Sequence, residues 1–161
     1  KGCETKIKAL KKLNNKDIYL DIFGDGPLED SLKSLVKLYK LQKNVKFNGF
    51  QKISENKLKK FHLLVSASHF EGLPNAIAES INYNLPVVAP NINGGTRELL
   101  LNGKGGYLYK PNDYFDLSKK INMYLDNPKE FILKSKIAKK NLSRYYIKNV
   151  IKQFEWNISK L

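Results

Sequence analysis

The stretch LLVSASHFEGLPNAIAESINYNLPVVAP, at residues 63–90, decides the fold of this 161-residue chain. Its apolar start predicts a strand, and a turn at residues 71–74 leads into an expected helix over residues 75–83. Residues 84–86, Asn-Leu-Pro, end that helix, and a second apolar run then predicts another strand. A strand, a loop, a helix and a strand in this order form the building block of parallel α/β sheets.

Two glutamates flank the loop of this unit: Glu71 at its start and Glu79 inside the helix. In parallel sheets, ligands bind beyond the carboxyl ends of the strands, where loops meet helix N-termini. A carboxylate in that place can accept hydrogen bonds from the vicinal hydroxyls of a ribose or a hexose. The alternative is that both glutamates are ordinary solvated acids, since their spacing alone is a weak signal.

The start of the expected helix is suited to an anion. Pro74 fits a first helical turn, where its missing N–H would have no partner within the helix. The N–H groups of Asn75 and Ala76 then point out of the helix start, with the positive end of the helix dipole behind them. Gly72 allows a ligand to approach the backbone closely. This combination predicts a phosphate-binding site.

The sequence Glu-Gly-Leu-Pro-Asn, followed by a second Glu and a Leu-Pro-Val-Val strand, resembles the donor-binding half of a GT-B glycosyltransferase of family 4. The signature of that family is Glu, seven residues, Glu. The resemblance implies a Rossmann-like, doubly wound parallel sheet with helices on both faces. It also implies retaining transfer from a UDP- or GDP-linked sugar to a glycan or lipid-linked acceptor, in cell-surface polysaccharide synthesis.

The resemblance also implies roles for individual residues. Glu71 would hold sugar hydroxyls and Glu79 the ribose, while Lys1, in a Lys-Gly pair like that of the family, would bind the diphosphate. The catalytic candidates are therefore Glu71 and Lys1. The donor-binding candidates are Gly72, Leu73, Asn75, Ala76 and Glu79 around the central loop, Gly24 and Gly26 in a Gly-Asp-Gly-Pro turn, Phe50 and Gln51 after a strand, and Gly94 and Gly95 in a Gly-Gly-x-x-Glu segment.

The turn at residues 24–27 leaves an alternative open. A strand, a Gly-x-Gly turn and a helix suggest a dinucleotide-binding fingerprint, but Glu29 occupies the place of its third glycine. A tight strand–helix connection, with no ligand contact, explains these two glycines about as well. The glycine pair Gly94 and Gly95 is expected to allow the backbone to approach the donor closely.

The remaining periodicity predicts five strands in all, near residues 17–23, 44–48, 63–67, 86–89 and 106–109. Ser54 and Asp113 are expected to begin helices. Leu28 is assigned to the inward face of the helix after the turn at residues 24–27, and Leu125 to the inward face of the helix that Asp113 begins. The last two helices are expected near residues 128–141 and 143–159.

The length fits a single domain over residues 1–161. By resemblance, the chain is expected to be a fragment that lacks an N-terminal acceptor domain and the first strand of this one, and to be inactive alone. Phe154 and Trp156 make the last helix more apolar than a free helix requires. They are expected to stay partly exposed in the isolated chain and to face the missing domain in the whole enzyme.

The net charge of +14 raises the question of a nucleic-acid or membrane partner. The lysines are scattered, and Arg97 and Arg144 are the only arginines, which disfavours nucleic acid. Contact with an anionic membrane surface stays open. No apolar run reaches the ~20 residues that span a bilayer, and no apolar signal segment is present. Cys3 is the only cysteine, so cytoplasmic localisation is expected, with a place at the inner face of the membrane left open.

Neither a metal nor a cofactor is expected, and the nucleotide sugar is a substrate. His62 and His69 have no second His or Cys at ligand spacing, and no Asp-x-Asp pair occurs to bridge a metal to a diphosphate. His69 is assigned to packing within its loop. The alternative to a transferase is a non-catalytic nucleotide-binding or interaction module of the same fold.

Overall fold

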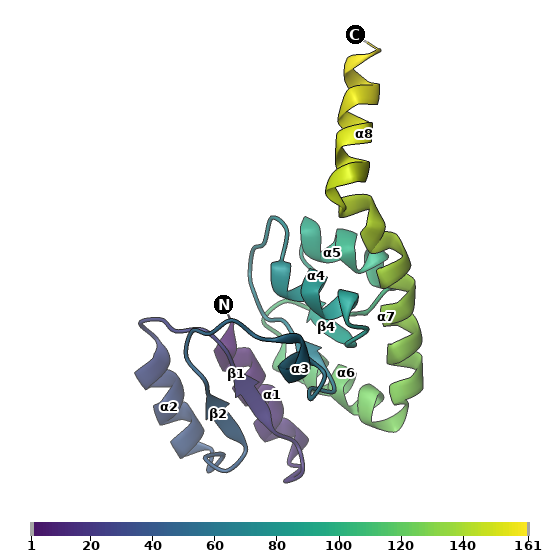
Figure 1. The fold of residues 1–161 in the computed structure, drawn as a ribbon. Helices are drawn as coiled ribbons and strands as arrows, with labels where there is room; N and C mark the ends of the chain where they lie inside the picture. The colour runs from purple at the N-terminus through teal and green to yellow at the C-terminus, as the bar shows by residue number, and fades with distance from the viewer. Residues whose placement is uncertain (1, 161) are drawn as a thin grey trace.

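The computed structural model describes residues 2–160 and shows five short parallel strands flanked by helices (Figure 1). Each strand overlaps the range that the sequence predicts for it, so the parallel α/β prediction is confirmed. The strands are β1 (Leu20–Ile22), β2 (Val45–Phe47), β3 (Leu64–Val65), β4 (Val87–Pro90) and β5 (Tyr107–Tyr109).

The helices of the described part are α1 (Cys3–Leu13), α2 (Glu29–Leu38), α3 (Glu55–Leu58), α4 (Asn75–Asn82), α5 (Gly95–Leu99), α6 (Tyr114–Asp126), α7 (Pro128–Leu142) and α8 (Ile147–Ile158), with 3-10 turns η1 (Leu101–Gly103) and η2 (Ser143–Tyr145). Both expected N-caps are confirmed. The Ser54 side chain accepts a hydrogen bond from the Lys57 N–H, and the Asp113 carboxylate accepts from the N–H groups of Phe115 and Asp116.

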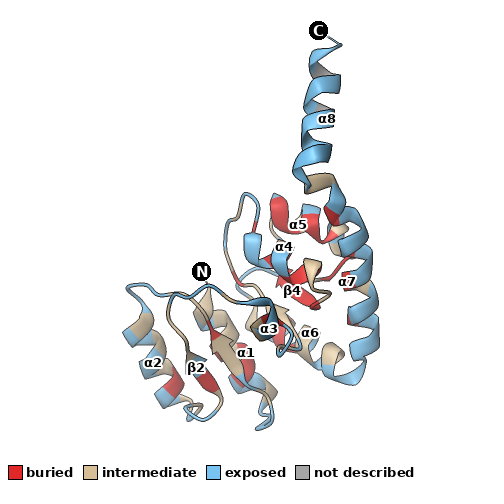
Figure 2. Ribbon diagram, viewed as in Figure 1, coloured by how far each residue is buried: buried red, intermediate tan, exposed pale blue. Residues whose placement is uncertain are grey.

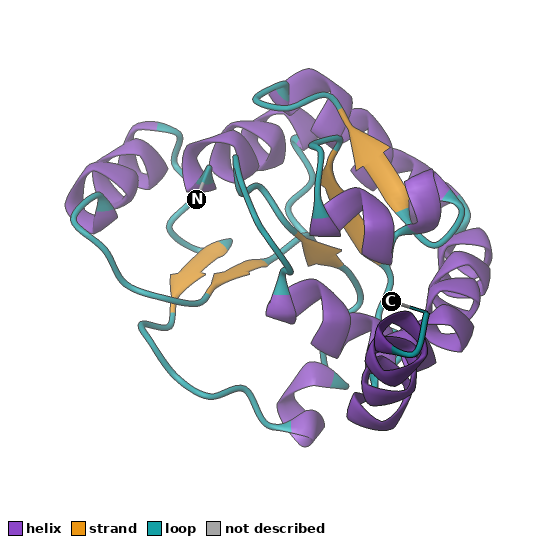
Figure 3. Ribbon diagram, turned by 90° about the horizontal axis from the view of Figure 1, so that it is seen from above, coloured by secondary structure: helices purple, strands orange, loops and turns teal. Residues whose placement is uncertain are grey.

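The strands form two sheets, one with the order β1–β2 and one with the order β3–β4–β5. Within residues 2–160, no strand pairs with both β1 and β3. Helix α1 packs against both sheets: Ile7 and Leu10 cluster with β1 and β2, while Ala9 clusters with Val88 of β4 and Tyr109 of β5. This helix therefore joins the two sheets into one body, as the view from above shows (Figure 3).

Every residue of β4 is buried (Figure 2), and its side chains alternate between two hydrophobic clusters. Val87 and Ala89 lie in a cluster with residues of α4, α5 and α7. Val88 lies in a different cluster, with residues of α1, α6 and α7. Helices therefore cover both faces of this sheet, which confirms the doubly wound arrangement and explains the continuous apolar run of the strand.

The predicted inward orientation is wrong for two residues, Leu28 and Leu125. Leu28 is 65% exposed, because α2 begins only at Glu29 and Leu28 is the N-cap residue outside the helical period. Leu125 is 43% exposed and lies in the last turn of α6, one residue before that helix ends at Asp126. The rest of the predicted inward face of α2 packs against β1 and β2 as expected: Leu32, Leu35, Val36 and Tyr39.

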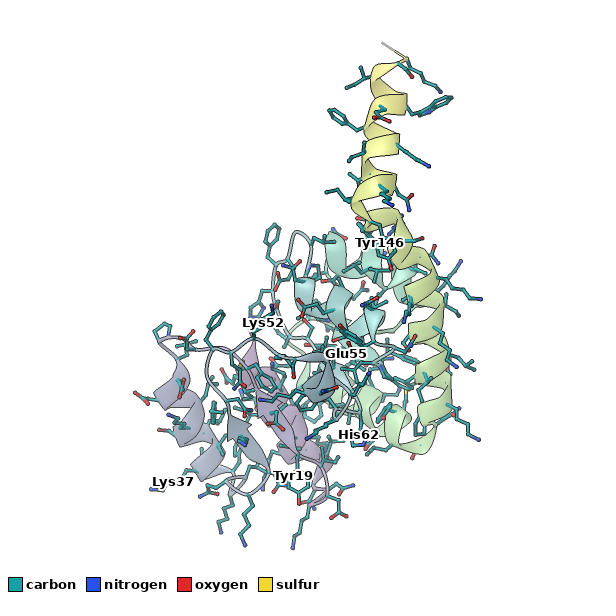
Figure 4. All side chains as sticks on the ribbon, in the orientation of Figure 1. Tyr19, Lys37, Lys52, Glu55, His62 and Tyr146 are labelled. Atoms are coloured by element: carbon teal, nitrogen blue, oxygen red, sulfur yellow. The ribbon has the colours of Figure 1, made fainter. Side chains whose placement is uncertain are left out.

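Helix α8 extends away from the rest of the molecule, and its side chains project on all sides beyond Tyr146 (Figures 1 and 4). Phe154 is 67% exposed and Trp156 is 61% exposed, so the expected exposure of apolar residues on this helix is confirmed. Among residues 2–160, no helix is both long and apolar enough to cross a membrane.

Candidate functional site

The loops at the carboxyl ends of the strands meet in two pairs. The loop after β1 contacts the loop after β2, where the Gly24 N–H donates to the Gly49 carbonyl oxygen at 2.8 Å. The loop after β3 contacts the loop after β4, where the Gly95 N–H donates to the Gly72 carbonyl oxygen at 3.0 Å. Candidate residues from distant parts of the sequence therefore share one edge of the parallel strands, where ligands bind in α/β folds.

Helix α4 starts at Asn75, and Pro74 is its N-cap with an extended ψ of 99°. Because Asn75 and Ala76 are the first two residues of the helix, their N–H groups have no acceptor within it. Both residues are exposed, and the neighbouring Leu73 is 48% exposed. The helix start therefore presents free N–H groups and the positive end of its dipole to solvent.

The two signature glutamates lie on either side of this helix start in the sequence. Glu71 is half-buried in the loop, whereas Glu79 is exposed on α4, between the core-facing residues Ile77, Ser80 and Ile81. The ion pairs formed by residues 2–160 involve neither glutamate. Both carboxylates can therefore accept hydrogen bonds from a ligand, although exposure alone would equally suit solvated acids.

Lys1, the cationic candidate, lies outside the described residues. Its neighbour Gly2 lies against the end of β3, where an added Cβ atom would be 2.1 Å from the Ala67 carbonyl oxygen. Gly2 also has a positive φ of 60°. A glycine is therefore required here for the close approach and the backbone conformation together.

The candidates after β2 lie on the surface. Phe50 is 85% exposed. The Gln51 side-chain amide donates to the Asn48 carbonyl oxygen at 2.6 Å and accepts from Lys57 Nζ at 2.7 Å, so both ends of this amide are already engaged. Figure 4 shows the next residue, Lys52, on the segment that leads to α3.

Arg144 is a residue whose role the sequence analysis missed. Its Nη2 donates to the Glu98 carbonyl oxygen at 3.0 Å and lies 3.4 Å from Glu98 Oε1, which ties η2 to α5. No local pattern connects these two residues in the sequence, so no sequence signal predicts the contact. The structure also corrects the assignment of His69, which is exposed rather than packed within its loop.

A cavity of about 410 Å³ lies away from this site. It is lined by Tyr19, Leu20, Asp21, Gln42, Lys43, Asn44, Val45 and Lys46. They comprise residues just before β1 and β2 and the first two residues of each strand. This is the opposite end of the strands from the loop between β3 and α4 (residues 66–74, the glutamate loop). None of the candidate residues lines this cavity.

The family model of glycosyl transferases group 1 matches residues 1–149. The chain belongs to this family. It is 36% identical, over 126 residues, to an uncharacterised glycosyltransferase of Methanocaldococcus jannaschii; the match covers 69% of this chain and 31% of that protein. It is 27% identical, over 129 residues, to a poly(ribitol-phosphate) alpha-N-acetylglucosaminyltransferase of Staphylococcus aureus, covering 79% of this chain and 26% of that protein.

Among solved structures, a single-residue mutant of S. aureus TarM, in complex with fondaparinux, alpha-GlcNAc-glycerol and UDP, superimposes with a TM-score of 0.84 at 25% identity. That match covers 96% of this chain and 32% of TarM. The chain thus spans between a quarter and a third of the length of these relatives. The family assignment and the GT-B resemblance of the sequence analysis are confirmed.

Proposed function

We propose that this chain is the donor-binding domain of a retaining glycosyltransferase that uses a UDP- or GDP-linked sugar. The observation that carries the proposal is the placement of Glu71 and Glu79 around the free helix start of α4, at the carboxyl edge of a parallel sheet. In a chain that belongs to glycosyl transferases group 1, this arrangement suits a sugar nucleotide better than it suits surface acids.

Each part of the donor has a candidate partner in this site. The N–H groups of Leu73, Asn75 and Ala76, with Lys1, would bind the diphosphate and offset the charge that develops on it as the leaving group. Glu79 would accept hydrogen bonds from the ribose hydroxyls. Glu71 would hold hydroxyls of the sugar at the reacting centre. No metal enters this scheme, because backbone and lysine donors supply the positive charge.

The names of the relatives support the substrate class. The S. aureus relative is a poly(ribitol-phosphate) alpha-N-acetylglucosaminyltransferase, and TarM was solved with UDP. By analogy, we propose a glycan or lipid-linked acceptor and a role in cell-surface polysaccharide synthesis. Peripheral contact with the inner face of a membrane, favoured by the net charge of +14, is part of the same proposal.

We also propose that the chain works as part of a longer enzyme. The first strand of this domain and an acceptor domain would precede residue 1. The chain spans only about a third of the length of its relatives, which supports this proposal. The two sheets on which α1 packs support it as well, because no strand in the described part of the chain joins them. The isolated domain would then bind donor weakly and transfer nothing.

A donor panel on the full-length protein tests the proposal. We expect one UDP- or GDP-sugar to raise the melting temperature and to be consumed in the presence of a lipid-linked glycan acceptor. NMR of the product should show the anomeric configuration of the donor. A protein that no sugar nucleotide stabilises would contradict the proposal. Donor binding without transfer to any acceptor would favour the non-catalytic module instead.

A further inference from the structure

The glycine pair after β4 lies against the loop that carries Glu71. The Gly95 N–H donates to the Gly72 carbonyl oxygen at 3.0 Å. Gly95 is buried, and an added Cβ atom would lie 2.1 Å from that oxygen and 2.9 Å from Leu73 Cα. Because real Cβ atoms essentially never come closer than 3.0 Å to such atoms, a side chain at position 95 requires one of the two loops to move.

Gly94 adds a second constraint to the same contact. Its φ of 101° and ψ of −155° belong to a region that essentially only glycine adopts. An added Cβ atom would also lie 3.1 Å from the Glu71 carbonyl oxygen. The backbone of the two glycines therefore lies against the backbone of residues 71–73.

Gly72, on the other side of this contact, does not have to be a glycine. A Cβ atom added to Gly72 meets no atom within 4 Å, and the backbone of Gly72 does not have a positive φ. The close approach therefore depends on Gly95, which the sequence analysis assigned to approach of the donor. In the structure, the space beside its Cα is filled by the glutamate loop.

When a side chain is introduced at position 95, the glutamate loop is the part that will move. On the other side, α5 is anchored by Thr96 and Leu99, which are 1% and 3% exposed, and by the hydrogen bond from Arg144 to the Glu98 carbonyl oxygen. Within the loop, by contrast, residues 72–73 are exposed. The displacement needed is about 1 Å, the difference between the 2.1 Å contact and the 3.0 Å limit.

We propose that Gly95 is a positioning residue, which sets the place of the Glu71 carboxylate and of the N–H groups at the start of α4 through its contact with residues 71–73. This inference rests on the proposed function, because it concerns the same donor site. A shift of about 1 Å in groups that orient a substrate can lower the rate on the order of a hundredfold. Gly95 acts through the loop and needs no contact with the donor.

The test compares two glycine variants of the full-length protein. Gly95→Ala places a methyl group against the glutamate loop. Gly105→Ala is the matched control: Gly105 is also buried, and its added Cβ atom would lie 2.7 Å from Ala138 Cβ, in contact with α7 rather than with the loop. Both variants should lose thermal stability. Only Gly95→Ala should speed amide hydrogen exchange at position 95 and at Ile77, by at least tenfold, because these N–H groups donate to the carbonyl oxygens of Gly72 and Pro74.

Activity provides a second readout in the same proteins. With the sugar nucleotide found in the donor panel, Gly95→Ala should lower kcat/KM at least tenfold, and Gly105→Ala at most twofold. If Gly95→Ala does not fold, Gly94→Ala takes its place: its contact with the Glu71 carbonyl oxygen is longer, at 3.1 Å, but its φ of 101° adds backbone strain. Gly103→Ala then serves as the control, because Gly103 has a similar φ of 95° and does not contact the loop.

Two results would overturn the inference: unchanged exchange at position 95 and at Ile77 in Gly95→Ala, or equal changes in Gly95→Ala and Gly105→Ala. Failure of the proposed function has a different signature. In that case no sugar nucleotide would stabilise the protein in the donor panel, while the exchange measurement, which needs no donor, would still report on the contact between the loops.

Discussion

The Tyr109 hydroxyl donates a hydrogen bond to the Ser66 carbonyl oxygen at 3.1 Å, which connects β5 to the end of β3 across the intervening β4. Tyr109 is 1% exposed, so this hydroxyl has little access to water. Ser66 lies where β3 ends and the chain turns into the glutamate loop. The hydrogen bond therefore fixes the end of the strand from which the candidate site extends.

Replacing Tyr109 with Phe should destabilise the fold. The variant keeps the ring in place but removes the donor, and it leaves the Ser66 carbonyl with one partner fewer. We expect the free energy of unfolding to fall by about 1 to 3 kcal/mol, measured by urea denaturation. Tyr19→Phe is the control, because Tyr19 is 69% exposed, and it should change stability by no more than about 0.5 kcal/mol. Equal stability of the two variants would contradict the role of the hydrogen bond.

The hydroxyl groups of Tyr109 and Tyr107 should lose their protons only at a higher pH than an ordinary tyrosine. Burial raises the pKa of Tyr109 well above its ordinary value of 10.0. Burial and a hydrogen bond to the Glu130 carboxylate raise the pKa of Tyr107 to about 12. Phenolate absorbance of the wild type minus that of Tyr109→Phe isolates the titration of Tyr109. We expect this difference signal to appear only well above pH 10, and a midpoint near 10 would contradict the burial argument.

The same shifts have a consequence for stability. Because the pKa of each tyrosine is higher in the folded protein than in the unfolded chain, the protonated form is favoured by folding. The resulting contribution to the free energy of unfolding is fully present below pH 10. It is lost as the pH rises from 10 towards the pKa of the folded protein. The free energy of unfolding should therefore decrease with pH in this window, and less steeply in Tyr109→Phe than in the wild type.

Helix α8 gives a direct optical test of its exposure. Trp156 is the only tryptophan of the chain, and Lys160 Nζ lies 4.3 Å from its ring centroid. In the isolated domain we expect emission close to that of indole in water, and efficient quenching by acrylamide. Phe154→Ser should change the free energy of unfolding by no more than about 0.5 kcal/mol, because Phe154 is also exposed. Trp156 emission that is blue-shifted and poorly quenched by acrylamide would instead show that α8 packs on the domain.

Patterns within a few residues were sufficient to predict most of the fold. The apolar runs predicted the five strands. A single polar residue before each of two helices, Ser54 and Asp113, predicted their caps. Periodicity failed at the helix ends, for Leu28 and Leu125, because it does not determine where the first and last turns lose contact with the sheet.

Contacts between distant segments could not be predicted in this way. The hydrogen bonds from Gly95 to Gly72 and from Tyr109 to Ser66 depend on how separate loops and strands meet, which no local pattern encodes. The sequence did predict a special role for Gly95, since a glycine pair before a helix is a strong backbone signal. It could not show that the neighbour of this glycine is another loop. The ligand roles of Glu71 and Glu79 stay predictions.

The roles of the two glutamates can be separated by two charge-removing variants of the full-length enzyme. If Glu79 accepts charge-assisted hydrogen bonds from the ribose, each worth roughly 1.5–3 kcal/mol, Glu79→Gln should weaken binding of the donor's nucleoside diphosphate on the order of tenfold or more. Folding should barely change, because Glu79 is exposed. Wild-type affinity in this variant, measured by calorimetry, would end the ribose assignment.

Glu71→Gln should act on a different quantity. If Glu71 holds the sugar at the reacting centre, the variant should lower turnover more than it lowers affinity for the bare nucleoside diphosphate, since the diphosphate carries no sugar. Two solvated surface acids would behave otherwise: neither variant would change binding or turnover, and stability would stay within about 0.5 kcal/mol of the wild type. Measuring turnover and nucleotide affinity in parallel for both variants therefore distinguishes a ribose ligand, a sugar ligand and a surface acid.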